Sequence, residues 1–137
     1  MPNSNLKKLQ NAYDLWSSSK GVDSSCWFEI AADNVIFHSM GNGNPALSFA
    51  RDRHSKKELA DYFAKLANDW TMVFWSPETF VNEGDRVAMF GVCSWRDKET
   101  GKIAECRVAH LTKFRKGQII EFTEIFDSAR ALAATMP

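Results

Sequence analysis

The stretch that decides the fold runs from Ile103 to Phe126 and reads IAECRVAHLTKF, then RKG, then QIIEFTEIF. Two apolar runs of strand character flank a short loop that ends in Gly117, a pattern that predicts a β-hairpin. A three-residue loop ending in glycine is typical of a type I turn with a glycine bulge, because glycine accepts the left-handed backbone without a side-chain clash. We therefore predict a hairpin whose loop is residues 115–117.

The length of this loop sets the register of the hairpin. The predicted pairs are Phe114 with Gln118, His110 with Phe122 and Val108 with Glu124. His110 and Glu124 then lie on one face as diagonal neighbours, within reach of each other. A two-residue turn at Lys116 and Gly117 is the alternative, and by slipping the pairing by one it would put the two side chains on opposite faces. The three-residue loop is preferred because it collects the aromatic side chains on one side.

Because this face is otherwise apolar, we predict that it forms the wall of a ligand pocket. His110 and Glu124 would be the two strong proton carriers of that wall. Burial favours a neutral carboxyl and a nearby imidazolium favours an ionised one, so such a pair can hold a proton near neutral pH. It could take a proton from carbon next to a carbonyl and return it elsewhere. The other residues expected to line the pocket are Trp16, Trp27, Cys106, Val108, Thr112, Phe122 and Phe126.

Length and composition bound the rest of the interpretation. The 137 residues predict one domain over 1–137, with its core at about 5–130. Seventeen basic and 17 acidic residues balance, which argues against nucleic acid or anionic membrane as a partner. No apolar run approaches the ~20 residues that span a bilayer, and a cytoplasmic protein is expected. Three cysteines without close spacing predict no disulfide framework and no metal site, and no cofactor is expected.

Hydrophobic periodicity organises the remaining chain into helices followed by strands. Helices are predicted over 5–19, 24–32 and 56–68, and strands over 35–40, 70–76, 78–82 and 86–95. Ser55 with Glu58 is typical of a capping box at the start of the third helix. Helices first and an antiparallel meander afterwards predict an α+β fold, in which a curved sheet wraps around about three helices to form a cone with an apolar cavity.

The order and spacing of these segments resemble the nuclear transport factor 2-like (cystatin-like) superfamily, which includes ketosteroid isomerase, scytalone dehydratase and SnoaL-like polyketide cyclases. The segments that carry the likeness are Tyr13–Trp16, Phe28–Phe37, Lys57–Phe63, Thr100–Lys102, Phe114–Glu121 and Phe126–Ala129. The resemblance implies the cone-shaped fold. It does not by itself imply one reaction, because the superfamily hosts many chemistries and non-enzymes.

Site residues implied by the resemblance depend on the relative chosen. In SnoaL-like cyclases an acidic residue of the last strand works with a histidine of the preceding strand, and Glu124 and His110 fit those places. In ketosteroid isomerases the general base would fall on or beside His38, and Tyr13 roughly matches the tyrosine that donates to the oxyanion. Scytalone dehydratases pair histidines with an aspartate beside a tyrosine, which Tyr13, Asp14 and His110 echo. The epoxide hydrolases of this fold need a carboxylate that the sequence lacks at Ala109.

These observations predict a cofactor-independent isomerase, aldol-type cyclase or dehydratase acting on a small hydrophobic carbonyl compound. His110 and Glu124 would be its acid/base pair, with His38 assisting and Tyr13 orienting. The alternatives are a non-catalytic ligand-binding domain and an assembly domain, in which His110 and Glu124 satisfy each other as a structural pair. Apolar residues on both strand faces further predict a homodimer through the outer face of the sheet.

Overall fold

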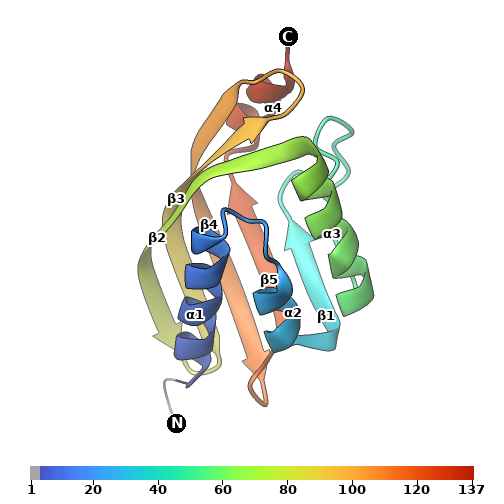
Figure 1. Cartoon of the computed structure of the whole chain (residues 1–137). Coiled ribbons are helices and arrows are strands. Elements are labelled where there is room, and N and C mark those ends of the chain that lie inside the picture. The colour runs from blue at the N-terminus through green and yellow to red at the C-terminus, as the bar shows by residue number, and fades with distance from the viewer. Residues whose placement is uncertain (1–3) are drawn as a thin grey trace.

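The computed structural model describes residues 4–137, which form four helices and five strands (Figure 1). In chain order they are α1 (Ser4–Ser18), α2 (Ser25–Ile30), β1 (Ala31–Ser39), α3 (Lys56–Asp69), β2 (Trp70–Glu83), β3 (Arg86–Asp97), β4 (Ile103–Arg115), β5 (Gln118–Phe126) and α4 (Ser128–Thr135). The sheet order is β1-β5-β4-β3-β2, with β1 parallel to β5 and the other neighbours antiparallel. The predicted α+β class is confirmed.

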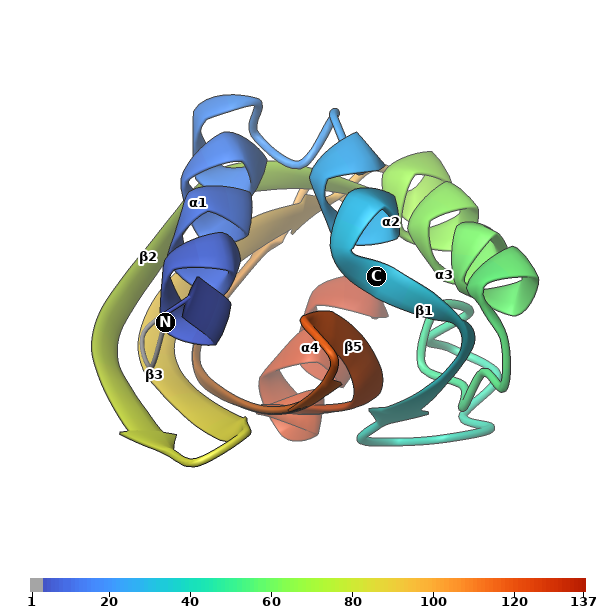
Figure 2. The same cartoon turned by 90° about the horizontal axis from the view of Figure 1, so that it is seen from below.

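The sheet curves strongly and does not close. Seen from below, it wraps around a space whose open side is covered by α1, α2 and α3 (Figure 2). The predicted cone around three helices is therefore present. A fourth helix, α4, was not predicted; it packs against β4 and β3 at one end of the sheet (Figure 1).

The hairpin of β4 and β5 turns differently from the prediction. Arg115 pairs with Gln118, so the loop is the two residues Lys116 and Gly117. Both have positive φ, 52° and 77°, the combination that a two-residue type I′ turn requires. The three-residue loop was wrong because lysine adopts the left-handed backbone here, a conformation that the sequence pattern assigned to glycine alone.

A β-bulge follows the turn and restores the arrangement of the faces. Phe114 pairs with Ile119 but Lys113 pairs with Glu121, so Ile120 is an extra residue in β5. The extra residue offsets the slip that a two-residue turn produces. His110 therefore stands directly opposite Glu124 and not opposite Phe122. The predicted register was wrong, whereas the prediction that His110 and Glu124 share a face holds.

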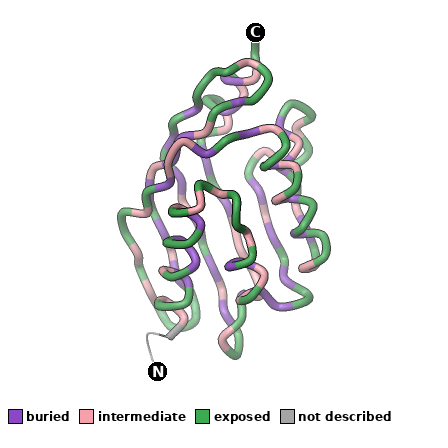
Figure 3. The backbone as a smooth tube through the Cα atoms, viewed as in Figure 1, coloured by how far each residue is buried: buried purple, intermediate pink, exposed green. Residues whose placement is uncertain are grey.

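Strict alternation in β4 separates the core from solvent. Its core face consists of Ala104, Cys106, Val108, His110, Thr112 and Phe114, all buried. Figure 3 shows buried and exposed positions along the other strands as well, with a less regular pattern in β2 and β5. The helices complete the core, with Leu9, Tyr13 and Trp16 from α1 and Leu59 and Tyr62 from α3. The core therefore fills the hollow between the curved sheet and the helices.

The outer face of the sheet carries a row of half-exposed apolar side chains. Phe90, Leu111 and Ile125 are each about half exposed, on three neighbouring strands. Phe90 and Ile125 both pair with Ala109, so these side chains form one apolar patch. The homodimer through this face stays a prediction. In residues 4–137 no helix is long and apolar enough to cross a membrane.

Candidate active site

A cavity of about 100 Å³ lies between the concave face of the sheet and the helices. All five tryptophans of the chain line it: Trp16, Trp27, Trp70, Trp75 and Trp95. Further aromatic walls come from the first and last strands, through Phe37 and Phe122. Polar groups are few, so each ionisable side chain that reaches the cavity does so in an environment of low polarity.

Glu124 is the one carboxylate that lines this cavity within the described residues. Tyr62 Oη donates a hydrogen bond of 2.6 Å to Glu124 Oε1, and Ser39 Oγ donates one of 2.7 Å to Oε2. Burial raises the pKa of Glu124 above its ordinary value, and the two hydrogen bonds oppose that shift. Each carboxylate oxygen keeps a free lone pair. The carboxyl group is thus held in place, with a raised affinity for a proton and capacity for a further partner.

His110 lines the same cavity from β4, the strand next to β5, and its side facing away from the cavity contacts Tyr13. The distance from Tyr13 Oη to His110 Nδ1 is 2.6 Å. Trp75 stacks on the imidazole at 5.4 Å between ring centroids, and on the Tyr13 ring at 6.1 Å. This layer of three rings fixes the plane of the imidazole.

The imidazole of His110 is neutral at pH 7, because burial lowers its pKa to about 3. Burial and the charge of Glu124 raise the pKa of Tyr13, which stays protonated. Since Tyr13 Oη makes no other side-chain hydrogen bond in residues 4–137, the network assigns its proton to the bond with Nδ1. His110 then carries its own proton on Nε2, which is buried and has no partner among the described residues. The residue that lines the cavity at this point therefore carries a hydrogen-bond donor, Nε2–H, that is not yet in use.

His110 and Glu124 are opposite one another across the two strands but do not hydrogen-bond to each other. Directly opposed side chains have their Cβ atoms about 4.5–5.5 Å apart. Each group has its own hydrogen-bond partners instead. Tyr13 binds the imidazole, and Ser39 and Tyr62 bind the carboxyl group. The interpretation in which the two satisfy each other as a structural pair does not describe this arrangement. The site has two separate polar groups facing one apolar space.

Most of the predicted pocket residues line the cavity, namely Trp16, Trp27, Cys106, Val108, Phe122 and Phe126. Tyr13 and Thr112 are fully buried behind the wall and do not line it. Tyr13 reaches the cavity only through His110. Thr112 Oγ1 has no hydrogen-bond partner in the described part of the chain. Asp14 is exposed on α1.

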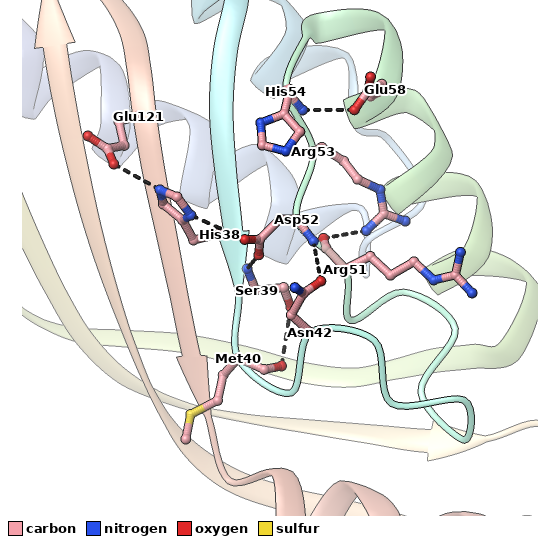
Figure 4. Close-up of polar contacts among 10 residues, drawn as sticks. All are labelled: His38, Ser39, Met40, Asn42, Arg51, Asp52, Arg53, His54, Glu58 and Glu121. Carbon is pink, nitrogen blue, oxygen red and sulfur yellow. Dashed lines mark hydrogen bonds and ion pairs between the residues drawn. The ribbon is translucent and has the colours of Figure 1, made fainter.

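The expectation that His38 faces the cavity was wrong. In the second half of β1 the buried residues are Val35, Phe37 and Ser39, so the intervening His38 points to the outside of the sheet. There its Nε2 lies 2.9 Å from Glu121 Oε2 and its Nδ1 lies 3.4 Å from Asp52 Oδ2 (Figure 4). The hydrogen bond with Glu121 raises the pKa of His38, and Asp52 adds to the effect. His38 therefore belongs to a surface ion cluster.

Ser39 and Tyr62 are the site residues that the sequence analysis missed. Tyr62 lies on the buried side of α3 together with Leu59 and Leu66. Ser39 alternates with Val35 and Phe37 along β1 and shares their buried face, which the sequence could not distinguish from the face of Ile36 and His38. The backbone N–H of Ser39 donates a hydrogen bond of 3.0 Å to Asp52 Oδ1. This bond links the end of β1 to the surface ion cluster of His38 (Figure 4). A buried serine and tyrosine on inward positions predict partners for a buried carboxyl.

Comparison with known proteins agrees with this fold. The sequence model of the SnoaL-like domain matches residues 10–122. A nuclear transport factor 2-like protein from Burkholderia thailandensis is 22% identical, with a TM-score of 0.82 over 97% of this chain and 98% of its own. A SnoaL-like polyketide cyclase from a Jannaschia species is 15% identical, with a TM-score of 0.76 over 99% and 94%. TerC, co-crystallised with polyporic acid, is 17% identical, with a TM-score of 0.82 over 96% and 98%.

At these identities the structural likeness supports the fold. No curated protein is similar enough in sequence to count as a match.

Proposed function

This chain belongs to the SnoaL-like domain family, and from that premise we propose that it is a cofactor-independent acid/base enzyme acting on a small hydrophobic carbonyl compound. The observation that carries the proposal is the buried carboxyl of Glu124, held by Tyr62 and Ser39 in an aromatic cavity. A carboxylate whose pKa burial has raised is a stronger base than one in water.

The proposed first step is removal of a proton from the carbon next to the carbonyl. Ionised Glu124 takes the proton, and the electron pair of the broken C–H bond moves to the carbonyl oxygen as an enolate. His110 donates its Nε2–H to that oxygen, as the unpaired donor in the wall. A neutral imidazole suits this task, because a buried donor aimed at developing charge stabilises it without solvent reorganisation.

The second step returns the proton from Glu124 to the substrate. Returned to another carbon, the proton completes an isomerisation; delivered to a leaving hydroxyl, it completes a dehydration. Attack of the enolate carbon on a second carbonyl would give an aldol-type cyclisation. In each case the proton taken up by Glu124 is released again, so the enzyme ends as it began and needs no redox partner.

The cavity limits the size of the substrate. A cavity of roughly 150 Å³ binds benzene, and this one measures about 100 Å³. As it stands it holds at most a molecule of about one ring, and any larger substrate would require the lining side chains to move. TerC, a structural neighbour, was co-crystallised with polyporic acid, which supports the proposal that a fold of this kind holds a small organic molecule.

The test is hydrogen exchange on small cyclic ketones and enones in D₂O, followed by NMR, with binding followed in parallel by quenching of tryptophan fluorescence. We expect deuterium to enter the carbon next to the carbonyl faster than in buffer alone, and Glu124→Gln to abolish the gain while binding remains. Binding without exchange by the parent chain would indicate a ligand-binding domain instead. Exchange that survives Glu124→Gln would place the chemistry elsewhere.

A further inference from the structure

Two cysteines stand directly opposite each other in the wall of the cavity. Cys93 on β3 pairs with Cys106 on β4 in the antiparallel ladder. Both side chains line the cavity and both are free thiols. Their positions are independent of the acid/base site, because the proposed proton transfer uses neither thiol. A pair of buried thiols facing each other requires its own explanation.

The spacing of the two residues suits a covalent bond between them. Directly opposed residues of antiparallel strands have their Cα atoms about 4.5 or 5.5 Å apart, depending on the type of pair. Disulfides form across Cα separations of roughly 4.4–6.8 Å. Cys93 and Cys106 therefore meet the Cα requirement in either case, and a small approach of β3 and β4 at this pair would bring the two sulfurs together.

The two thiols differ in their access to the outside. Cys93 is almost fully buried. Cys106 lines the cavity and also a second, surface pocket, whose other walls are Val92, Glu105, Arg107, Asp127 and Arg130. Cys106 is thus the one of the two cysteines that also lines a pocket on the surface, together with Arg107 and Arg130.

The surroundings of Cys106 favour its reactive, ionised form. The neighbouring Cys93 thiol and the backbone N–H of Asp127 lower the pKa of Cys106, whereas burial opposes the shift. The same pairing raises the pKa of Cys93. Cys26, the third cysteine, is different: burial and the nearby charge of Asp23 raise its pKa to about 11. The chain therefore has one activated thiol, one thiol next to it and one inert thiol.

We propose that Cys93 and Cys106 are a dithiol modification site that small disulfides convert to an intramolecular disulfide. The Cys106 thiolate attacks one sulfur of the small disulfide, forms a mixed disulfide and expels the first small thiolate. The Cys93 thiol loses its proton and attacks the Cys106 sulfur, which expels the second small thiolate. Two protein thiols are oxidised to one disulfide, the small disulfide is reduced to two thiols, and excess small thiol reverses both steps.

The experiment treats the reduced full-length chain with oxidised glutathione, quenches it with acid, alkylates the remaining thiols and measures intact mass and peptide masses. We expect the loss of two hydrogens, a peptide cross-link between Cys93 and Cys106, and alkylation of Cys26 alone. Added dithiothreitol should restore three alkylated thiols. Equal reaction at Cys26 and Cys106, a stable mixed disulfide in the parent, or reaction only under denaturing conditions would each overturn the proposal.

Variants with one cysteine replaced distinguish the thiol that attacks the small disulfide, Cys106, from the thiol that completes the intramolecular disulfide, Cys93. Cys93→Ser should stop at a mixed disulfide on Cys106, and Cys106→Ser should leave Cys93 unmodified. Cys26→Ser is the matched control and should cross-link at the rate of the parent. Because the peptide map of the parent chain already identifies the bond, the proposal remains testable if a core variant fails to fold. Rapid modification of Cys93 in the Cys106→Ser chain would contradict the assignment of Cys106 as the attacking thiol.

Discussion

Two histidines on opposite sides of the same sheet show how position sets chemistry in this fold. His110 faces the cavity with one neutral partner, Tyr13, and burial lowers its pKa to about 3. His38 faces outward between Glu121 and Asp52, and the hydrogen bond with Glu121 raises its pKa. The same side chain is thus a neutral hydrogen-bond donor on one face, whereas on the other face its neighbours favour the charged form.

The comparison teaches that burial governs the protonation of His110, whereas the facing carboxylates govern that of His38. Inside, an imidazolium would lose its hydration without gaining a hydrogen-bonded counter-ion, so the neutral form is favoured. Outside, water and two carboxylates stabilise the charge. The chemistry assigned to the cavity therefore depends on keeping carboxylates, other than Glu124, on the outer face. Substitutions on the two faces should have unequal effects.

The largest contrast is expected between two glutamates of β5. Glu124→Gln should lower the rate of carbon deprotonation by about 100- to 10,000-fold, because the base is removed. Glu121→Gln, on the outer face of the same strand, should leave the rate within a factor of two of the parent. The measurement is the initial rate of deuterium incorporation with both variants folded by circular dichroism. Equal rates for the two variants would remove the basis for assigning the base.

The next effect concerns His110 and the stability of the protein in acid. Its pKa is lowered on folding, so the unfolded chain binds more protons between about pH 6.5 and about pH 3. His110 should therefore destabilise the fold as the pH falls below about 6.5, by up to ~1.4 kcal/mol per pH unit. Urea unfolding at a series of pH values measures this slope. His110→Gln should flatten it, and an unchanged slope would show that the histidine is not buried in neutral form.

A smaller change is expected from Tyr62→Phe, which removes one of the two donors to Glu124. Loss of that hydrogen bond raises the pKa of Glu124 further, because the bond favours the ionised form. The rate of proton abstraction rises with pH through this pKa, so its rising limb should move to higher pH in Tyr62→Phe. If the rising part of the pH–rate profile does not move in Tyr62→Phe, the ionisation that controls the rate belongs to a group other than Glu124. Stability should fall by about 1–3 kcal/mol.

The outer face allows a different test of the same contrast. If the patch of Phe90, Leu111 and Ile125 is the homodimer interface, Phe90→Glu should give a folded monomer, because it places a charge in an apolar contact. Light scattering after size-exclusion chromatography gives the mass of each form. Lys113→Glu, an outward change of charge near the end of β4, is the control and should remain dimeric. A monomeric parent chain would end the prediction.

The smallest effect is expected for His38→Gln. The folded pKa of His38 is raised, so its contribution to stability is fully present below its ordinary pKa of about 6.5 and is lost as the pH rises through the folded value. The side chains are partly exposed, so the difference from the parent should be below about 1 kcal/mol at pH 5.5 and close to zero at pH 9. Urea unfolding at both pH values checks this, and a large loss at pH 9 would show a packing role instead.

Much of the fold could be predicted because periodicity reports which side of an element is buried. The alternation in β4 and the apolar stripes of α1 and α3 are local patterns, and their order gave the α+β cone. The short helix α4 was missed because its run of alanines lacks the wide apolar stripe that predicts an amphipathic helix. Pro77 was predicted to separate two strands. In the structure β2 continues through Pro77, with an irregularity in its pairing to β3 at that point.

The candidate site was harder to predict because it depends on side chains brought together from distant parts of the chain. His110 and Glu124 were found through the hairpin, which is local. The partners of Glu124 come from β1 and α3, and no sequence spacing links Ser39 or Tyr62 to it. His38 was misplaced because two alternating sets in β1 both contain apolar residues. Only the packing of β1 beside β5 decides which set is inside.

The bulge at Ile120 makes the chemistry sensitive to how one residue of β5 is paired. If β5 continued from the two-residue turn as a regular ladder, with Ile120 paired and no bulge, His110 would stand opposite Thr123, and every side chain beyond that point would exchange faces. Ile125 would enter the cavity, and Glu124 would move out to solvent. Deletion of Ile120 itself would not have this effect, because the shortened strand still pairs Lys113 with Glu121 and His110 with Glu124. Proteins that share this turn and strand length but lack the bulge would be expected to hold ligands without transferring their protons.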